Sequence, residues 1–190
     1  MTGRKPYLEA LVALLGPDDV LVSGLGANSR YLPHLPVRGP VFALCDAMGA
    51  AIPLALGMAL ARPERRVMAL EGDGSLLMSP NVLATVAAAR AANLTVLLWV
   101  NGRYESSGGQ ALPAVTVDWL ALARATGLHH AERVIDVGGL CAALPRAMAS
   151  GPALLALEVA FEPDEPVPPY SERPEEIRAR FADRLRPPAA

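Results

Sequence analysis

The feature that most constrains the fold is a pair of apolar segments separated by a stretch of helical composition. Residues 67–70 and 95–100 are apolar runs of the length expected for strands buried on both faces. Residues 80–92 between them are rich in alanine, valine and leucine, and a proline at their start is typical of the first turn of a helix. A strand, a helix and a strand in this order predict two neighbouring parallel strands.

Glycines and polar side chains follow directly after these two expected strands. Gly72-Asp73-Gly74-Ser75 is expected to form a turn after the first strand, and Asn101 comes after the second. Open α/β sheets bind ligands at the carboxyl ends of their strands, so Asp73 and Asn101 are expected to lie together there. A carboxylate and an amide oxygen suit Mg²⁺, which usually also binds phosphate oxygens. Glycines allow the backbone amides of Gly74 and Ser75 to approach a phosphate, so the sequence predicts a site for Mg²⁺ and a diphosphate.

Strands and helices alternate along the rest of the chain. Further strands are expected at 19–23, 41–44, 131–137 and 153–159, and further helices at 7–15, 50–61, 117–125, 140–149 and 171–185. The alternation predicts an α/β fold with a doubly wound, mostly parallel sheet and helices on both faces. We expect residues 1–160 to form one domain, on which a proline-rich connector and a C-terminal helix at 161–190 pack. Asp118 is expected to help start its helix, and Ser171 and Glu175 to lie near the start of the last helix.

Composition and charge exclude several classes of function. The net charge of -2 and the lack of a basic cluster argue against binding to nucleic acid. Proline, glycine or charged residues interrupt the longest apolar runs, so no membrane-spanning helix is expected. The N-terminal segment has no small-residue cleavage site and is expected to form an amphipathic helix. The isolated Cys45 and Cys141 favour reduced thiols in a cytoplasmic protein.

A second glycine-rich turn follows the expected strand at 19–23. Gly24 and Gly26, with Asp46 lying 20 residues after Gly26, imitate a dinucleotide-binding fingerprint. Ser29 occupies the position of the third glycine, and three prolines lie where the crossover helix of that motif should run. We therefore interpret the turn as a second phosphate-binding loop, and we regard a nicotinamide-binding module as the less favoured alternative.

The spacing of the motif resembles the signature of enzymes that use thiamine diphosphate, in which Gly-Asp-Gly is followed by Asn. Here the 26 residues from 75 to 100 separate Gly74 from Asn101. Residues 20–160 are similar to the diphosphate-binding domain of thiamine-diphosphate-dependent decarboxylases, and most similar to that of phosphonopyruvate and sulfopyruvate decarboxylases. The resemblance is carried by residues 22–30, by residues 46–86, by the loop NGRYESSGGQ at 101–110 and by the terminal helix.

This resemblance implies roles for particular residues. Mg²⁺ would be bound by Asp73, Asn101 and the backbone carbonyl of Arg103. Thiamine diphosphate would be bound by Ser23, Gly24, Leu25, Asp46, Met48, Gly72, Gly74, Ser75, Glu105 and Ser106. Within this set, Met48 would support the bent shape of the cofactor, and the carbonyl of Asp46 would accept from its aminopyrimidine. Tyr104, Ser107 and Gln110 are candidates for contact with the substrate.

The resemblance also implies that half of the active site lies on another domain. Enzymes of this group have a second domain with a glutamate that activates the aminopyrimidine, and neither Glu71 nor Glu105 matches its position. We therefore expect a β subunit of a 2-oxo acid decarboxylase, a carboxy-lyase acting on 3-sulfo- or 3-phosphonopyruvate. An α subunit would supply the pyrimidine-binding domain and the catalytic glutamate in a hetero-oligomer. The alternatives are a subunit of an acetolactate-synthase-like enzyme and a non-catalytic assembly subunit.

Overall fold

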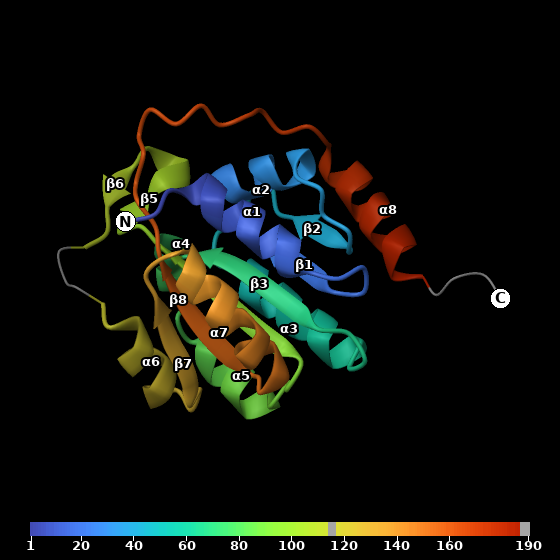
Figure 1. Cartoon of the computed structure of the whole chain (residues 1–190), viewed down its shortest axis with the longest axis vertical. Helices are drawn as coiled ribbons and strands as arrows, with labels where there is room; N and C mark the ends of the chain where they lie inside the picture. Colours follow the sequence, from blue (N-terminus) through green and yellow to red (C-terminus); the bar gives the residue numbers. More distant parts are fainter. Residues whose placement is uncertain (114–116, 187–190) are drawn as a thin grey trace.

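Six parallel strands form the central sheet, in the order β2-β1-β3-β4-β8-β7 (Figure 1). The computed structural model describes residues 1–113 and 117–186; residues 114–116 of the expected domain and 187–190 of the expected C-terminal segment lie outside the described part. The strands are β1 (Val20–Ser23), β2 (Val41–Ala43), β3 (Val67–Gly72), β4 (Leu94–Val100), β7 (His130–Val134) and β8 (Ala153–Glu158). The expected doubly wound α/β sheet is thereby confirmed.

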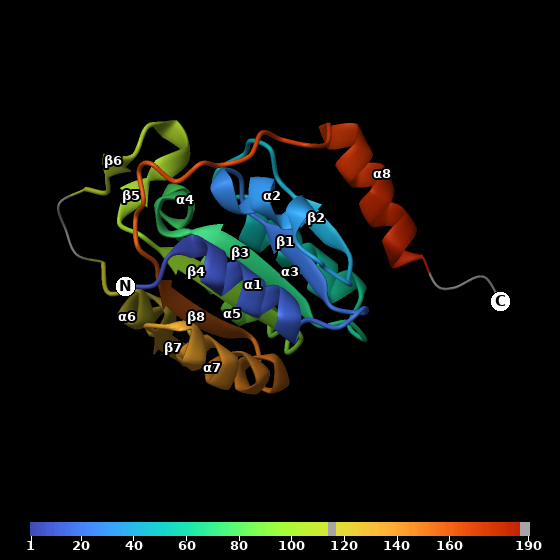
Figure 2. The ribbon, with the colours of Figure 1, turned by 45° about the horizontal axis from the view of Figure 1, so that its top comes forward.

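Helices cover both faces of this sheet (Figures 1 and 2). One face carries α1 (Arg4–Leu14), α7 (Val137–Ala149) and the 3₁₀ turn η1 (Leu32–His34), which follows the short helix α2 (Ala27–Tyr31). The other face carries α3 (Ala51–Ala61), α5 (Val82–Ala89) and α6 (Trp119–Ala125), while α8 (Pro174–Leu185) packs beside β2. None of the helices within the described ranges has the length and apolar character needed to cross a bilayer.

The strands alternate their side chains between two apolar layers. In β3, Val67 and Ala69 pack in the layer that contains α3 and α5, whereas Met68 and Leu70 pack in the layer that contains α1 and α7. This alternation follows from the two-residue period of a strand. Because both layers are buried, the strands read as continuous apolar runs in the sequence.

Two local expectations are corrected by the structure. The segment after residue 70 is not a turn: β3 continues to Gly72, and the short helix α4 (Asp73–Met78) begins at the next residue. The last helix begins at Pro174, and its start is capped by Arg173 and Glu176 rather than by residues around Ser171. The expected role of Asp118 is confirmed, since its carboxylate accepts from the first backbone amides of α6.

Two irregular segments complete the carboxyl edge of the sheet. The loop after β4 forms a small hairpin of β5 (Arg103–Tyr104) and β6 (Gln110–Ala111) around the 3₁₀ turn η2 (Glu105–Ser107). The connector, which we define as residues 162–170, crosses the same edge above α1 and α2 (Figures 1 and 2). The hydroxyl of Tyr31 donates to the Pro166 carbonyl at 2.8 Å, and the hydroxyl of Tyr170 donates to the Cys45 carbonyl at 3.0 Å. The connector thus joins the loops that follow β1 and β2.

Replacing Phe181 in α8 tests whether the C-terminal helix is part of the folded domain. The ring of Phe181 is buried and meets the ring of Phe42 edge to face, with centroids 5.2 Å apart. We expect Phe181→Ala to lower the free energy of unfolding by about 3 kcal/mol, because a buried aromatic side chain is lost. Urea unfolding would measure this. The exposed Arg178 on the same helix gives a control, Arg178→Ala, with a change within about 0.5 kcal/mol. Equal effects of the two variants would contradict the assignment.

Candidate functional site

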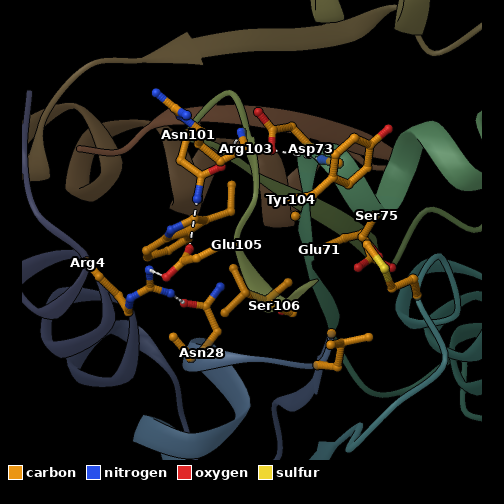
Figure 3. Close-up of a pocket in the computed structure, with 18 residues that line it drawn as sticks. Arg4, Asn28, Glu71, Asp73, Ser75, Asn101, Arg103, Tyr104, Glu105 and Ser106 are labelled. Carbon is orange, nitrogen blue, oxygen red and sulfur yellow. Dashed lines mark hydrogen bonds and ion pairs between the residues drawn. The ribbon is translucent and has the colours of Figure 1, made fainter. Parts of the chain in front are cut away.

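A pocket lies at the carboxyl ends of β1, β3 and β4 (Figure 3). After β1 the chain forms β2 on one side and then returns to form β3 on the other, so the winding of the sheet reverses between β1 and β3. Open α/β sheets bind ligands at such a point. The pocket is lined by Arg4, Gly24, Leu25, Ala27, Asn28, Met48, Leu70, Glu71, Gly72, Asp73, Gly74, Ser75, Trp99, Asn101, Arg103, Tyr104, Glu105 and Ser106.

Four of the residues expected at the site do not line this pocket. Ser23 is fully buried, and its hydroxyl donates to the carbonyl of Gly24 at 3.0 Å. Asp46 is exposed beyond the pocket wall. The side chains of Ser107 and Gln110 are also exposed, and the amide of Gln110 donates to the Ser107 carbonyl at 3.0 Å. Among the substrate candidates, the structure therefore brings only Tyr104 to the pocket.

The carboxylate of Asp73 is buried at the start of α4, with only 1% of the residue exposed. One of its oxygens accepts from the backbone amide of Gly74 at 2.8 Å, and the other accepts from that of Gly102 at 2.7 Å. Burial raises the pKa of Asp73 from 3.8 to about 6, although the backbone hydrogen bonds act in the opposite direction. Asp73 therefore joins the ends of β3 and β4 and carries a charge that a cation would stabilise.

Asn101 lies at the end of β4, next to Asp73 in the close-up view (Figure 3). Its amide oxygen accepts from the backbone amide of Arg103 at 3.0 Å, and its amide nitrogen donates to Glu105 at 2.8 Å. The carboxylate of Glu105 also forms an ion pair with Arg4. Because this carboxylate can only accept hydrogen bonds, the nitrogen of the Asn101 amide must face Glu105. The oxygen of the amide therefore faces the backbone of Arg103.

Two glycines allow the walls of the pocket to approach each other. A Cβ atom on Gly74 would lie 2.7 Å from the Tyr104 ring, and one on Gly24 would lie 2.6 Å from the carboxylate of Glu71. Both distances are too short for any other residue to fit without movement of the neighbour. The amide of Gly74 already donates to Asp73, whereas the hydroxyl of Ser75 accepts from the amide of Gly49 at 2.6 Å. These glycines let the Tyr104 ring and the Glu71 carboxylate pack against the backbone, and a phosphate site here stays a prediction.

Glu71 is a buried carboxylate that connects three parts of the site. It lies in β3, and its side chain accepts from the backbone amide of Ala51 at 3.0 Å, at the start of α3. The same carboxylate packs under the turn at Gly24. Burial raises the pKa of Glu71, while hydrogen bonds from Ser75 and from backbone amides oppose the shift. Glu71 thus caps α3 and holds it against the turn after β1 and the start of α4.

The loop that carries Met48 is held from both sides. Gly49 donates to Ser75, and Tyr170 of the connector donates to the carbonyl of Cys45. Ala47 has a positive φ of 55°, which is uncommon for a residue with a Cβ atom. Met48 itself is partly buried and lines the pocket, as the prop for a bent cofactor would.

Sequence reasoning missed several residues of the pocket, among them Arg4, Asn28 and Trp99. Arg4 begins α1 and is 2% exposed, and it donates to Asn28 at 3.1 Å. The indole N–H of Trp99 is buried without a hydrogen-bond partner among the described residues. No sequence signal marked these residues, because Arg4 belongs to an ordinary amphipathic helix and Trp99 to an apolar strand.

The set of oxygen donors fits a hard divalent cation that is shared with a phosphate ligand. Within residues 1–113 and 117–186, no group of three or more His, Cys, Asp and Glu side chains could hold a metal alone. Mg²⁺ usually binds one or two carboxylates and completes its octahedron with phosphate oxygens and water. The carboxylate of Asp73 and the amide oxygen of Asn101, beside the glycines after β1 and β3, match that arrangement.

Comparison with known proteins identifies the family of this pocket. The domain described as "Thiamine pyrophosphate enzyme, C-terminal TPP binding domain" matches residues 26–157. A phosphonopyruvate decarboxylase of Streptomyces hygroscopicus is 40% identical over 157 residues, which are 82% of this chain and 39% of that protein. The chain therefore spans about two fifths of the length of this relative.

Two further relatives are named for a related activity. A sulfopyruvate decarboxylase of Methanosarcina acetivorans is 32% identical over 170 residues, covering 88% of this chain and 43% of that protein. A sulfopyruvate decarboxylase subunit beta of Methanothermobacter thermautotrophicus is 35% identical over 129 residues, covering 68% of this chain and 69% of that protein. The family match over residues 26–157 includes the start of α4 and the hairpin after β4.

The raised pKa of Asp73 predicts how stability depends on pH in the absence of metal and cofactor. A carboxyl group whose pKa is higher in the folded than in the unfolded protein destabilises the fold when it ionises. The effect is absent below pH 3.8 and complete above about pH 6. A shift of about two pKa units corresponds to about 3 kcal/mol. We expect Asp73→Asn to gain about 3 kcal/mol relative to the wild type between about pH 3.5 and about pH 7.5.

Denaturant unfolding at a series of pH values, with a chelator present, measures this difference. The matched control is Asp118→Asn, because Asp118 is exposed and an asparagine can also cap α6. This variant shows how much stability changes when a carboxylate outside the pocket is replaced in the same way. A pH-independent difference between Asp73→Asn and the wild type would show that the pKa of Asp73 is not raised.

Proposed function

Because the chain belongs to the thiamine pyrophosphate enzymes through their C-terminal TPP-binding domain, we propose that it binds the Mg²⁺-diphosphate end of this cofactor. The observation that carries the proposal is the pair Asp73 and Asn101 at the ends of the adjacent strands β3 and β4. The glycines after β1 and β3 lie where the winding of the sheet reverses. A carboxylate, an amide oxygen and closely approaching backbone are what a metal-bound diphosphate requires.

Different residues of the pocket would bind the metal, the diphosphate and the rest of the cofactor. Asp73, Asn101 and the backbone carbonyl of Arg103 would bind Mg²⁺, and Asp73 is ionised above about pH 6. The amides of Gly74 and Ser75 and the turn at Gly24 and Leu25 would approach the diphosphate, with Glu105 and Ser106 in the closing loop. Met48 would support the bent cofactor from the facing loop. When bound, thiamine diphosphate supplies an electron sink for the carbanion that remains after loss of CO₂.

The proposed reaction is decarboxylation of a 2-oxo acid of the phosphonopyruvate or sulfopyruvate type. The names of the similar proteins support this substrate class. A phosphonate or sulfonate group requires hydrogen-bond donors or cations near the cofactor. Tyr104 and Arg103 both line the pocket. The guanidinium of Arg103 lies over the ring of Phe161, 5.2 Å from the centroid of that ring. Both side chains belong to the hairpin after β4 and are our candidates for selecting the substrate.

We further propose that the chain acts as a β subunit together with an α subunit. The support is the likeness to proteins named as beta subunits of sulfopyruvate decarboxylase. The pocket offers two buried carboxylates, Glu71 and Asp73, and each is engaged by backbone amides of this chain. In this proposal Asp73 binds the metal and Glu71 caps α3, so neither would activate an aminopyrimidine. The partner would bring the pyrimidine-binding domain and its glutamate, and the cofactor would lie between the two subunits.

Calorimetric titration of thiamine diphosphate with Mg²⁺ into the chain tests the proposal. The titration is made with the chain alone and with the product of a neighbouring gene that encodes a pyrimidine-binding domain. We expect binding to be much tighter with the partner. Asp73→Ala should weaken binding more than about 100-fold, since the carboxylate is the charged metal ligand of the site.

Asp118→Ala is the control for that variant, because Asp118 is exposed and does not line the pocket. It should bind thiamine diphosphate as the wild type does. No binding by the folded wild-type chain, with or without the partner, would reject the proposal and favour a non-catalytic assembly subunit.

A further inference from the structure

The guanidinium of Arg4 reaches into the pocket from the first turn of α1 (Figure 3). The residue is 2% exposed. Its side chain donates to Asn28 at 3.1 Å and to Glu165 of the connector at 3.0 Å, and it forms a third contact, an ion pair, with Glu105. These three acceptors compensate the buried charge of the guanidinium, which would be strongly destabilising if it were unpaired.

Glu105 connects Arg4 to Asn101. One oxygen of the Glu105 carboxylate binds Arg4, and the other accepts from the amide nitrogen of Asn101 at 2.8 Å. The amide oxygen of Asn101 is thereby turned to the opposite side, where it accepts from the backbone amide of Arg103. If the amide of Asn101 rotated by half a turn, its oxygen would face a carboxylate, and this arrangement is repulsive. Glu105 therefore determines which end of the Asn101 side chain is available to a metal.

An arginine suits this position for a physical reason. Its planar fork of N–H groups can satisfy acceptors in three directions at once, which the single ammonium group of lysine does less well. Burial tends to lower the pKa of Arg4, but the carboxylates of Glu105 and Glu165 raise it above its usual value. Arg4 therefore remains charged and neutralises the charge of Glu105 beside the metal ligands.

We propose that Arg4 is a positioning residue for the metal: it holds Glu105, which in turn holds the amide oxygen of Asn101 in the orientation that coordinates Mg²⁺. This inference rests on the proposed function of the same pocket. It also assigns a role to a residue that lies outside the matched range 26–157. Groups that orient metal ligands in this way typically change metal affinity 10- to 100-fold when they are removed.

Binding of Mn²⁺ in the presence of saturating thiamine diphosphate, followed by electron paramagnetic resonance, tests the role of Arg4. The complete chain is used, with its partner subunit where the wild type requires it. We expect Arg4→Met to weaken Mn²⁺ binding by about 10- to 100-fold. Arg4→Lys should restore part of the affinity, because a lysine retains the charge that faces Glu105.

Glu165→Gln is the matched control. It removes the other carboxylate that contacts Arg4 and leaves the ion pair between Arg4 and Glu105 in place. It should lower stability, because it weakens one of the contacts that hold Arg4, yet its affinity for Mn²⁺ should stay within about twofold of the wild type. A loss of affinity in Glu165→Gln equal to that in Arg4→Met would overturn the proposal, since it would trace the effect to general loosening of the pocket.

A double-mutant cycle tests whether Arg4 acts through Glu105. We expect Glu105→Ala to weaken Mn²⁺ binding as much as Arg4→Met does, and the double variant to bind no more weakly than Glu105→Ala alone. Additive losses would contradict a relay through Glu105. If Arg4→Met does not fold by circular dichroism, Glu105→Ala carries the test, and wild-type affinity in that variant would overturn the proposal.

The outcomes also separate this inference from the proposed function. If the wild type binds neither Mn²⁺ nor thiamine diphosphate, the proposed function fails. If the wild type binds both, and Arg4→Met and Glu105→Ala each bind Mn²⁺ as tightly as the wild type does, the proposed function stands and the role of Arg4 is rejected.

Discussion

The buried carboxylate of Asp73 is the group on which the rest of the site depends. Its two oxygens accept from the amides of Gly74 and Gly102, so one side chain joins the end of β3 to the segment that leaves β4. Burial makes its negative charge unfavourable in the protein alone, and a bound cation would reverse this effect. The carboxylate that lowers stability without metal is therefore the one that we propose to bind the cation.

The parallel topology explains why residues from distant parts of the chain meet around that carboxylate. Arg4 and Glu165 are 161 positions apart, yet they form an ion pair, because α1 begins at the carboxyl edge of the sheet and the connector crosses that edge (Figure 2). Glu71 also makes a contact of long sequence separation: its carboxylate caps α3 at Ala51, which lies 20 positions earlier in the chain. The pocket is held from several directions by contacts of long sequence separation, and each links a loop to a rigid helix or strand.

The sequence allowed most of the sheet and the centre of the site to be predicted. Strands buried on both faces produce apolar runs, and the residues after β3 and β4 carry the groups that a metal-bound diphosphate requires. The prediction was wrong where local chemistry is ambiguous. Gly72 and Asp73 read as a turn because glycine and aspartate favour turns. In the fold, Gly72 instead pairs with Trp99 as part of β3, and Asp73 starts α4.

The sequence by itself determined the alternation of strands and helices and the order in which ligand groups reach the carboxyl edge, since these depend on local periodicity and on the rule for parallel sheets. Only the tertiary structure decided which side chains line the pocket and which hold those side chains in place. Arg4, Glu71 and Glu165 carry no local signal, because an ion pair or a long-range helix cap depends on the distance between segments that are far apart in sequence. That distance exists only after the sheet has brought its strand ends together.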